Sequence, residues 1–128
     1  IGADTIVVLN GHNFGKPKDK NESYKMLRKL SGRTHEVITG VALIWKKRGM
    51  DITFNARTNV TFRKIPKDYI SYYLDSYNTL DKAGSYGIQD WFSVWVEKID
   101  GCYYNVMGFP LSTFYKYYLS LNNLQDIR

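Results

Sequence analysis

Two long runs of alternating residues, joined by a short basic turn, constrain the fold of this chain more than any other feature. From Thr34 to Lys46 both alternating sets of residues are largely apolar, which predicts a central strand covered on two sides. From Ile52 to Arg63 apolar residues alternate with polar ones, which predicts a half-solvated antiparallel strand. Because Lys47-Arg48-Gly49-Met50 connects the two runs, the sequence predicts a long hairpin within a β-sheet.

Helices and further strands are expected around this hairpin. Asp19 with Glu22 three places later forms a capping-box pattern, which predicts that a helix begins there. The helix then has one narrow buried face, made by Ser23, Met26, Leu27 and Leu30. Pro66 and Pro110 each open a later helix. Strands are expected over residues 1–9, 92–96 and 103–107, the last two joined by a turn at Asp100-Gly101.

These elements predict a single domain over residues 1–128. Its fold class is α/β, with a mixed twisted sheet of about five strands flanked by about three helices. The stripe of the last helix, at Leu111, Phe114, Tyr115, Tyr118 and Leu119, is expected to lie in the core or at an interface, and the tail from Asn122 is expected to fray.

Composition excludes several classes of protein. With 44% hydrophobic and 23% charged residues among 128, the chain is globular and long enough to bury a core. Its longest apolar runs, Ile6 to Leu9 and Val41 to Trp45, are far shorter than the roughly 20 residues that a membrane-spanning helix needs. The single cysteine, Cys102, excludes an internal disulfide and fits a reducing compartment. We therefore expect a cytoplasmic protein with no membrane partner.

The formal net charge of +6 favours polyanionic partners such as nucleotides, nucleic acid or an anionic surface. The basic residues cluster at 16–20, 25–33 and 46–48. A solvated helix face and a charged hairpin tip explain the second and third clusters equally well. The first cluster lies beside Pro17 and Gly15, so it is the one that suggests a site.

A lone carboxylate, Asp4, lies in an apolar, β-branched run that is typical of a buried strand. Burying an ionised carboxylate without a partner is costly, so Asp4 has either a structural partner or a chemical role. Two loop lysines, Lys16 and Lys82, are suited to phosphate, and the glycines beside Lys82 would expose backbone amides to an anion. The amide of Gln89 could read a pyrimidine edge. Together these four side chains predict a site for a metal-bound polyphosphate.

Other familiar catalytic patterns are absent from the sequence. It has no Walker loop, no Gly-x-Ser-x-Gly and no zinc-type Cys/His spacing. His12, His35 and Cys102 are interpreted as structural or solvated residues.

Six segments, which cover nearly the whole chain in order, carry a resemblance to a known family. They are Gly2-Ala3-Asp4-Thr5, Gly15-Lys16-Pro17, Met26-Leu27-x-x-Leu30-Ser31-Gly32-x-x-His35-x-Val37-x-Thr39-Gly40-Val41, Phe62-Arg63, Leu80-Asp81-Lys82-Ala83-Gly84-x-Tyr86-Gly87-Ile88-Gln89 and Tyr104-Asn105-Val106-x-Gly108-x-Pro110-Leu111. The chain thereby resembles the Maf family, the septum-formation-inhibitor proteins that act as nucleoside triphosphate pyrophosphatases. The resemblance implies an inosine-triphosphatase-like fold, a divalent metal (Mg or Mn), a homodimer, and cleavage of the substrate between its α- and β-phosphates.

The resemblance also implies roles for individual residues. Asp4 resembles the family's proton acceptor, which activates water together with the metal, and Lys16 and Lys82 resemble its phosphate-binding lysines. Thr5 and Gln89 match the positions that separate the dTTP/UTP branch from the branch that acts on methylated GTP and CTP. Both have the form found in the dTTP/UTP branch.

Two departures from the family pattern accompany the resemblance. The opening segment of the family, a strand with a phosphate-binding loop, is missing, so we expect an N-terminally truncated protein that could hydrolyse poorly. Asp90, Trp91 and Phe92 stand where small, Gly-rich residues are usual. We expect a nucleoside triphosphate pyrophosphatase acting on dTTP or UTP. The alternative is a non-enzymatic septum regulator or a basic nucleic-acid-binding module, although nucleic acid is not the partner we expect.

Overall fold

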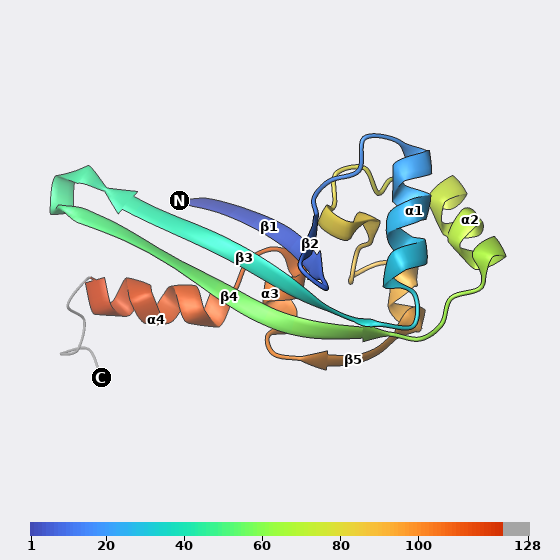
Figure 1. The fold of residues 1–128 in the computed structure, drawn as a ribbon. Coiled ribbons are helices and arrows are strands. Elements are labelled where there is room, and N and C mark those ends of the chain that lie inside the picture. The colour runs from blue at the N-terminus through green and yellow to red at the C-terminus, as the bar shows by residue number, and fades with distance from the viewer. Residues whose placement is uncertain (122–128) are drawn as a thin grey trace.

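Five strands form one sheet in the order β2-β1-β3-β4-β5 in the computed structural model, which describes residues 1–121 (Figure 1). The strands are β1 (Gly2–Leu9), β2 (His12–Phe14), β3 (Thr34–Trp45), β4 (Met50–Phe62) and β5 (Val96–Asp100). The helices are α1 (Lys20–Leu30), α2 (Lys67–Ser76), α3 (Tyr103–Met107) and α4 (Leu111–Leu121), with 3₁₀ turns η1 (Lys46–Arg48), η2 (Ala83–Ser85) and η3 (Trp91–Trp95).

The α/β class is confirmed. Every strand pair within the described residues is antiparallel, whereas a mixed sheet was expected. The expectation for the tail from Asn122 lies outside the described residues. Within residues 1–121, none of the helices combines the length and the hydrophobicity that crossing a bilayer demands.

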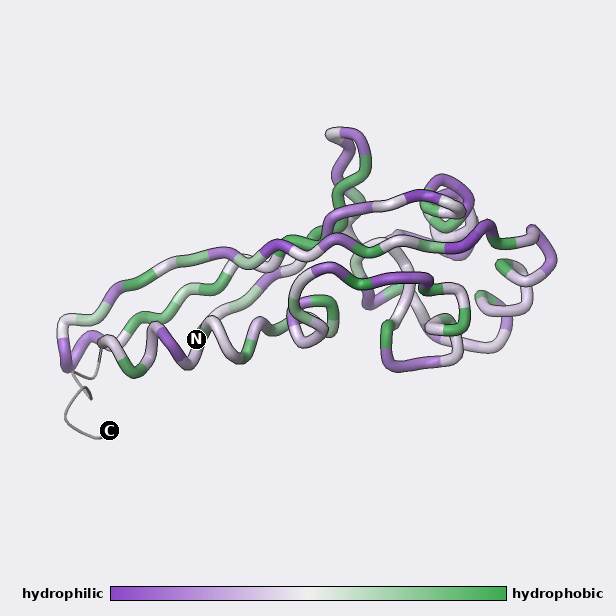
Figure 2. Tube along the Cα trace, turned by 90° about the horizontal axis from the view of Figure 1, so that it is seen from below, coloured by the Kyte–Doolittle hydropathy of each residue, from purple (hydrophilic) through white to green (hydrophobic). Residues whose placement is uncertain are grey.

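The long hairpin is confirmed: β3 and β4 pair continuously from Thr34↔Thr61 to Trp45↔Met50. Its far half extends away from the rest of the sheet, and α4 runs beside it (Figure 1). The predicted alternation along β4 is also confirmed. Figure 2 shows it as a change between hydrophobic and hydrophilic residues along the long hairpin. The prediction that β3 is covered on two sides is wrong, because its second face is only half-buried and Ile44 there is 57% exposed.

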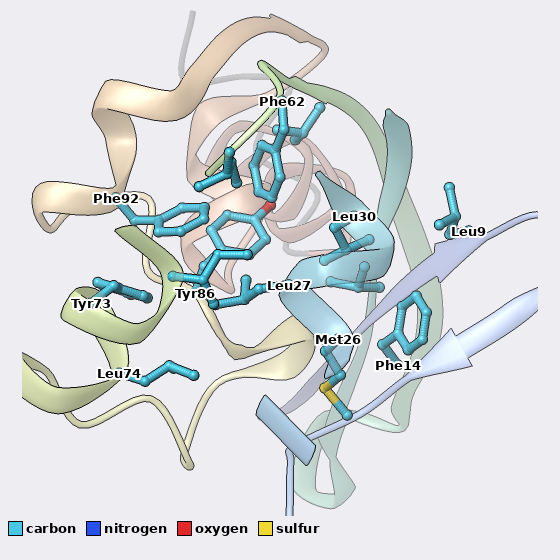
Figure 3. Packing of buried hydrophobic residues seen from close by; sticks show 14 of the residues in the cluster. Leu9, Phe14, Met26, Leu27, Leu30, Phe62, Tyr73, Leu74, Tyr86 and Phe92 are labelled. Atoms are coloured by element: carbon cyan, nitrogen blue, oxygen red, sulfur yellow. The ribbon is translucent and has the colours of Figure 1, made fainter. Parts of the chain in front are cut away.

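The core lies at the other end of the sheet, where α1 and α2 pack beside it (Figures 1 and 3). The predicted cap of α1 is confirmed, since Asp19 Oδ1 accepts a hydrogen bond from Glu22 N at 2.8 Å. The predicted buried face of α1 is confirmed too. Figure 3 shows Leu27 and Leu30 of this helix facing the aromatic rings of Phe62, Tyr86 and Phe92.

His35 belongs to this core. Its ring packs edge-on against Phe62 at 4.7 Å between centroids, and its Nε2 lies 2.8 Å from the hydroxyl of Tyr86. Burial lowers the pKa of His35 to about 4, so the imidazole is neutral at physiological pH. The structural interpretation of His35 is therefore confirmed.

Two predicted strands near the C-terminus are wrong. Residues 91–95 form η3, capped by Asp90, whose Oδ1 accepts from Phe92 N at 2.9 Å, and β5 begins only at Val96. Residues 103–107 form α3 instead of a return strand, and Gly108 ends that helix in the left-handed region at φ +117°. Buried Asn105 explains this helix, because its Nδ2 donates to Val37 O on β3 and Thr58 Oγ1 on β4.

The apolar stripe of α4 does not lie in the core, and its expected place at an interface stays a prediction. Leu111, Tyr115 and Leu119 are exposed, and Phe114 and Tyr118 are only partly buried. Tyr117, on another side of the helix, is the residue that stacks on Phe54 of β4, with ring centroids 4.6 Å apart.

Candidate functional site

A cavity of about 330 Å³ lies between β1, the loop over residues 82–90 and the end of α3. The strands contribute Thr5, Val7 and Val37; the loop contributes Lys82, Ala83, Tyr86, Gly87, Ile88, Gln89 and Asp90; and α3 with the residue after it contributes Val106, Met107 and Gly108. Three of the five predicted site residues, Thr5, Lys82 and Gln89, thus line one cavity.

Gly84 fixes the loop against β1. Its φ is +69°, and a Cβ at this position would lie 2.9 Å from Cγ2 of Val7, so only glycine permits so close an approach. Gly84 N donates to Gly15 O at 3.1 Å. This hydrogen bond joins the loop that carries Lys16 to the loop that carries Lys82.

Tyr73 of α2 holds the other end of the loop. Its hydroxyl donates to Asp90 Oδ2 at 2.8 Å and accepts from Gly87 N at 3.1 Å. Burial, then the hydrogen bond to Asp90, raises the pKa of Tyr73, so the hydroxyl stays protonated and remains a donor. Gln89 lies between the two residues that Tyr73 fixes, so Tyr73 positions the predicted base-reading amide.

The backbone amides of the loop do not behave as predicted. Gly84 N is bonded to Gly15 O, and Gly87 N is bonded to Tyr73. The expectation that these glycines present free amides to an anion is therefore wrong. A side chain at position 87 would displace the ends of two neighbouring side chains. A Cβ there would lie 2.7 Å from Cε of Lys82 and 2.8 Å from Oδ2 of Asp90.

Lys82 is the cation of the cavity wall. Its Nζ lies 3.4 Å from Oδ1 of exposed Asp81, an ion pair that solvent screens. Its aliphatic stem passes over Gly87. The side chain is half-exposed, so its ammonium group remains accessible to an anion.

Thr5 lies on the strand side of the cavity. Its Oγ1 is 2.9 Å from Oγ1 of Thr39, which in turn donates to the carbonyl of Asn105 at 3.4 Å. Because Thr39 donates elsewhere, the Thr5 hydroxyl donates to Thr39 and keeps lone pairs for a ligand.

Asp4 lies elsewhere. Side chains alternate along a strand, so Asp4 points away from the face that presents Thr5. It lines a shallow concavity of about 490 Å³ together with Gly40, Thr53 and Asn55. Asp4 is exposed, and its Oδ1 accepts from Thr5 N at 3.1 Å. The prediction of a buried carboxylate is therefore wrong, since the first half of β1 is a solvent-facing edge.

The predicted site residues are therefore only partly brought together. Lys16 is exposed and does not line the cavity of Thr5, Lys82 and Gln89. The hydrogen bond between Gly15 and Gly84 nevertheless holds its loop beside the loop that carries Lys82. Asp4 does not line that cavity either.

The donor set for a divalent metal is sparse. In the part of the chain that the structure describes, no three side chains of His, Cys, Asp or Glu gather closely enough to hold a metal ion. Asp4 offers one carboxylate. Mg²⁺ is commonly bound by one or two carboxylates together with water and substrate phosphates, so Asp4 fits a metal that obtains its other ligands in this way.

A sequence model described as Maf-like protein matches residues 1–120. The chain belongs to the Maf-like protein family. The resemblance drawn from the six sequence segments is thus confirmed, and the antiparallel sheet flanked by helices is consistent with that assignment.

Curated members of the Maf-like family are similar to this chain over most of its length. A protein of Thermotoga maritima named dTTP/UTP pyrophosphatase is 48% identical over 117 residues, which are 91% of this chain and 56% of that protein. Proteins with the same name from Porphyromonas gingivalis and Bacteroides fragilis are 45% and 48% identical, over 98% and 91% of this chain. In both, the matched region is 60% of the relative. The chain therefore spans well under two thirds of the length of these relatives.

Sequence reasoning missed the residues that support the site. Tyr73 was given no role at the site, because the sequence around it gives no signal for the partners of its hydroxyl. Asp90 was noticed as an unusual neighbour of Gln89, but neither of its roles was recognised: it caps η3 through a local contact to Phe92 N, and it accepts from the hydroxyl of Tyr73, 17 positions earlier.

Proposed function

We propose that the protein to which this chain belongs hydrolyses dTTP or UTP to the monophosphate and pyrophosphate. One observation carries the proposal: Thr5, Lys82 and Gln89 line a single cavity. The names of relatives at 45–48% identity support the same substrate class.

The cavity suits a pyrimidine nucleotide. Its volume of about 330 Å³ lies within the range for small-molecule sites. The amide of Gln89 can donate to a ring carbonyl and accept from a ring N–H, and the Thr5 hydroxyl can accept a further hydrogen bond. Tyr73 holds the segment 87–90 in place for this recognition.

The lysines provide the phosphate end of the proposed site. Lys82 lies in the cavity wall, and Lys16 lies on the neighbouring loop. Phosphoryl transfer depends mainly on positioning and on neutralising charge at the phosphoryl oxygens. In this proposal the two ammonium groups bind the phosphate chain and stabilise the departing pyrophosphate.

Asp4 acts as the proton acceptor for the attacking water and as the protein ligand of Mg²⁺ or Mn²⁺. A bound metal ion would neutralise phosphate charge and lower the pKa of water. Asp4 and Thr5 are consecutive residues of β1, so a substrate that contacts both has to pass around the edge of the strand. Among the described residues, no strand pairs with residues 2–6 at that edge, because β2 pairs only with Val7, Val8 and Leu9. A homodimer and a cytoplasmic location belong to the same proposal.

Pyrophosphate release from dTTP and UTP, with Mg²⁺ or Mn²⁺, tests the proposal. It should be measured for this chain and for a version extended to the length of the curated relatives. We expect Asp4→Asn to lower kcat by about 10²-fold or more, as is usual for loss of a general base. Asp51→Asn, a control at an exposed position on β4, should leave the rate unchanged.

An unchanged rate in Asp4→Asn would refute the assigned role. Salt-sensitive DNA binding with no hydrolysis in either version would instead support the nucleic-acid-binding alternative.

A further inference from the structure

A second concavity, which shares no lining residue with the cavity of Thr5, Lys82 and Gln89, is lined by basic residues. It has a volume of about 440 Å³ and lies where α1 ends and α2 begins. Its four charged lining residues are all cationic: Arg28, Arg33, Lys64 and Lys67. We propose that this basic concavity binds a di- or triphosphate group. The inference does not rest on the proposed hydrolase function.

The backbone beneath the cations is held rigidly. Gly32 N donates to Arg63 O at 3.2 Å, and Phe62 N donates to Arg33 O at 3.0 Å. Ile65 N donates to Oγ of Ser31 at 2.7 Å. These three hydrogen bonds join the turn after α1 to the segment after β4, so the side chains of Arg33 and Lys64 start from fixed points. A preorganised frame reduces the entropy lost when a ligand binds.

None of the four positive charges has an acidic partner among residues 1–121. The side-chain ion pairs among the described residues are Lys20–Asp75, Arg57–Glu36 and Lys82–Asp81, and none includes a cation of the basic concavity. The guanidinium of Arg28 lies 5.9 Å from the ring centroid of Tyr24, a contact that orients its charge without neutralising it. Asp68, in the first turn of α2, is exposed and does not line the concavity.

Four like charges around one hollow repel each other and raise the local concentration of anions. An anion with several charges relieves this repulsion best. Arginine presents paired N–H donors that match phosphate oxygens, and lysine contributes compact point charges. Pro66 gives α2 no side-chain cap, so the first-turn N–H groups add partial positive charge on the same side.

The lining favours a small polyphosphate over single-stranded nucleic acid. Proteins that bind single strands add aromatic platforms on which bases stack. Within the part of the chain that the structure describes, no aromatic residue lines the basic concavity. The exposed rings of α2, Tyr69 and Tyr72, pack instead near Trp95 and Trp91.

The test is a titration of the ¹⁵N-labelled protein followed by amide chemical shifts, in metal-free buffer at an ionic strength of about 0.1 M. Pyrophosphate and tripolyphosphate are the probes, and dTTP is a separate arm that distinguishes a nucleotide from an inorganic source of the phosphate chain. We expect shifts at residues 31–33 and 64–67. Arg33→Glu/Lys64→Glu should weaken binding by about tenfold or more, since both side chains are assigned direct contacts.

The matched control is Lys46→Glu/Lys47→Glu, which lowers the net charge by the same amount. These lysines lie in η1, at the far tip of the hairpin (Figure 1). The control should change the affinity by less than about twofold at an ionic strength of 0.1 M, where the screening length is about 10 Å. If reversal of two charges disturbs folding, Arg28→Gln/Lys67→Gln provides a milder variant with the same expected direction.

Three results would overturn the proposal. Equal weakening in both double variants would mean that the anion senses only the overall charge. Shifts confined to residues 82–90 would assign binding to the other cavity. Binding of a DNA oligonucleotide to residues 31–33 and 64–67 without binding of polyphosphate would make the surface a nucleic-acid site.

Discussion

Substitution Tyr73→Phe tests the claim that one buried hydroxyl holds the loop of the candidate site. The side chain is 0% exposed, and its hydroxyl makes two hydrogen bonds, to Asp90 Oδ2 and from Gly87 N. Phenylalanine keeps the ring and its packing against Phe92, at 4.6 Å between centroids. The substitution therefore removes the polar contacts alone.

The expected loss of stability follows from the two unsatisfied partners. A hydrogen bond to a charged group contributes about 1.5–3 kcal/mol, and a buried donor left without a partner costs about 1–3 kcal/mol. Asp90 is only partly buried, so water can partly replace the lost donor there. We expect a decrease of about 2–4 kcal/mol in the free energy of unfolding. For a domain of this size that corresponds to a fall in Tm of roughly 8–16 °C.

Urea denaturation, followed by tryptophan fluorescence and by circular dichroism, measures the change. The control is Tyr72→Phe on the same helix, where the side chain is 51% exposed, so the change should be within about 0.5 kcal/mol. Loss of the Tyr73 hydroxyl should also raise KM for dTTP more than it lowers kcat, because Gln89 is assigned to binding.

Equal stability of the Tyr73→Phe and Tyr72→Phe variants would refute the reasoning. So would a loss of stability with no change in KM, because the segment 87–90 would then not need this anchor to bind the substrate.

Two further predictions concern the packing of the core. Gly84→Ala should destabilise the protein by about 2–4 kcal/mol in urea, from the left-handed backbone and the clash with Val7. Gly49→Ala, which has φ +63° and open space around it, should lose only about 1 kcal/mol, and equal losses would contradict the clash. Burial lowers the pKa of His35 from 6.5 to about 4, so between these values the unfolded state binds more protons than the folded state. The contribution of neutral His35 to the free energy of unfolding should be fully present above pH 6.5. It should fall by about 3 kcal/mol as the pH drops towards 4. In denaturation curves measured across this pH range, His35→Gln should flatten the dependence of the free energy of unfolding on pH, and the control His12→Gln should not. A free energy of unfolding that does not change with pH in the wild type would contradict the lowered pKa of His35.

The elements that sequence reasoning predicted well are those that local chemistry determines. The cap at Asp19 and the stripe from Ser23 to Leu30 lie within one helix, so their signal is complete in about twelve residues. The hairpin was equally clear, because the alternation along β4 continues over its whole length.

The failures have a local cause at residues 92–96 and a distant one at residues 103–107. Residues 92–96 are apolar in both alternating sets, and periodicity alone cannot separate a strand from a buried turn of helix in so short a run. The cap at Asp90 decides in favour of η3. At residues 103–107 the deciding contacts are those of Asn105 with β3 and β4, 68 and 47 positions earlier in the chain.

The candidate site shows the same division. Motif resemblance selected Thr5, Lys82 and Gln89, which do line one cavity. The interpretation of the glycines failed because the acceptors of their amides, Gly15 O and the Tyr73 hydroxyl, come from segments that the local sequence does not specify. The burial of Asp4 was inferred from its apolar neighbours. Its exposure depends instead on how many strands pair with β1 at that position.

The position of Asp4 limits how the proposed reaction can be arranged. Residues 2–6 of β1 have a described partner strand on one side only, and the carboxylate projects from the face opposite Thr5. A base bound by Thr5 and Gln89 can therefore bring its phosphates to Asp4 only across the open edge of β1. Lys16 and Lys82 lie on loops joined to each other beside β1, close to where such a path would begin. The proposed chemistry requires the phosphate chain to cross this edge, and any segment that pairs with residues 2–6 would have to leave room for it.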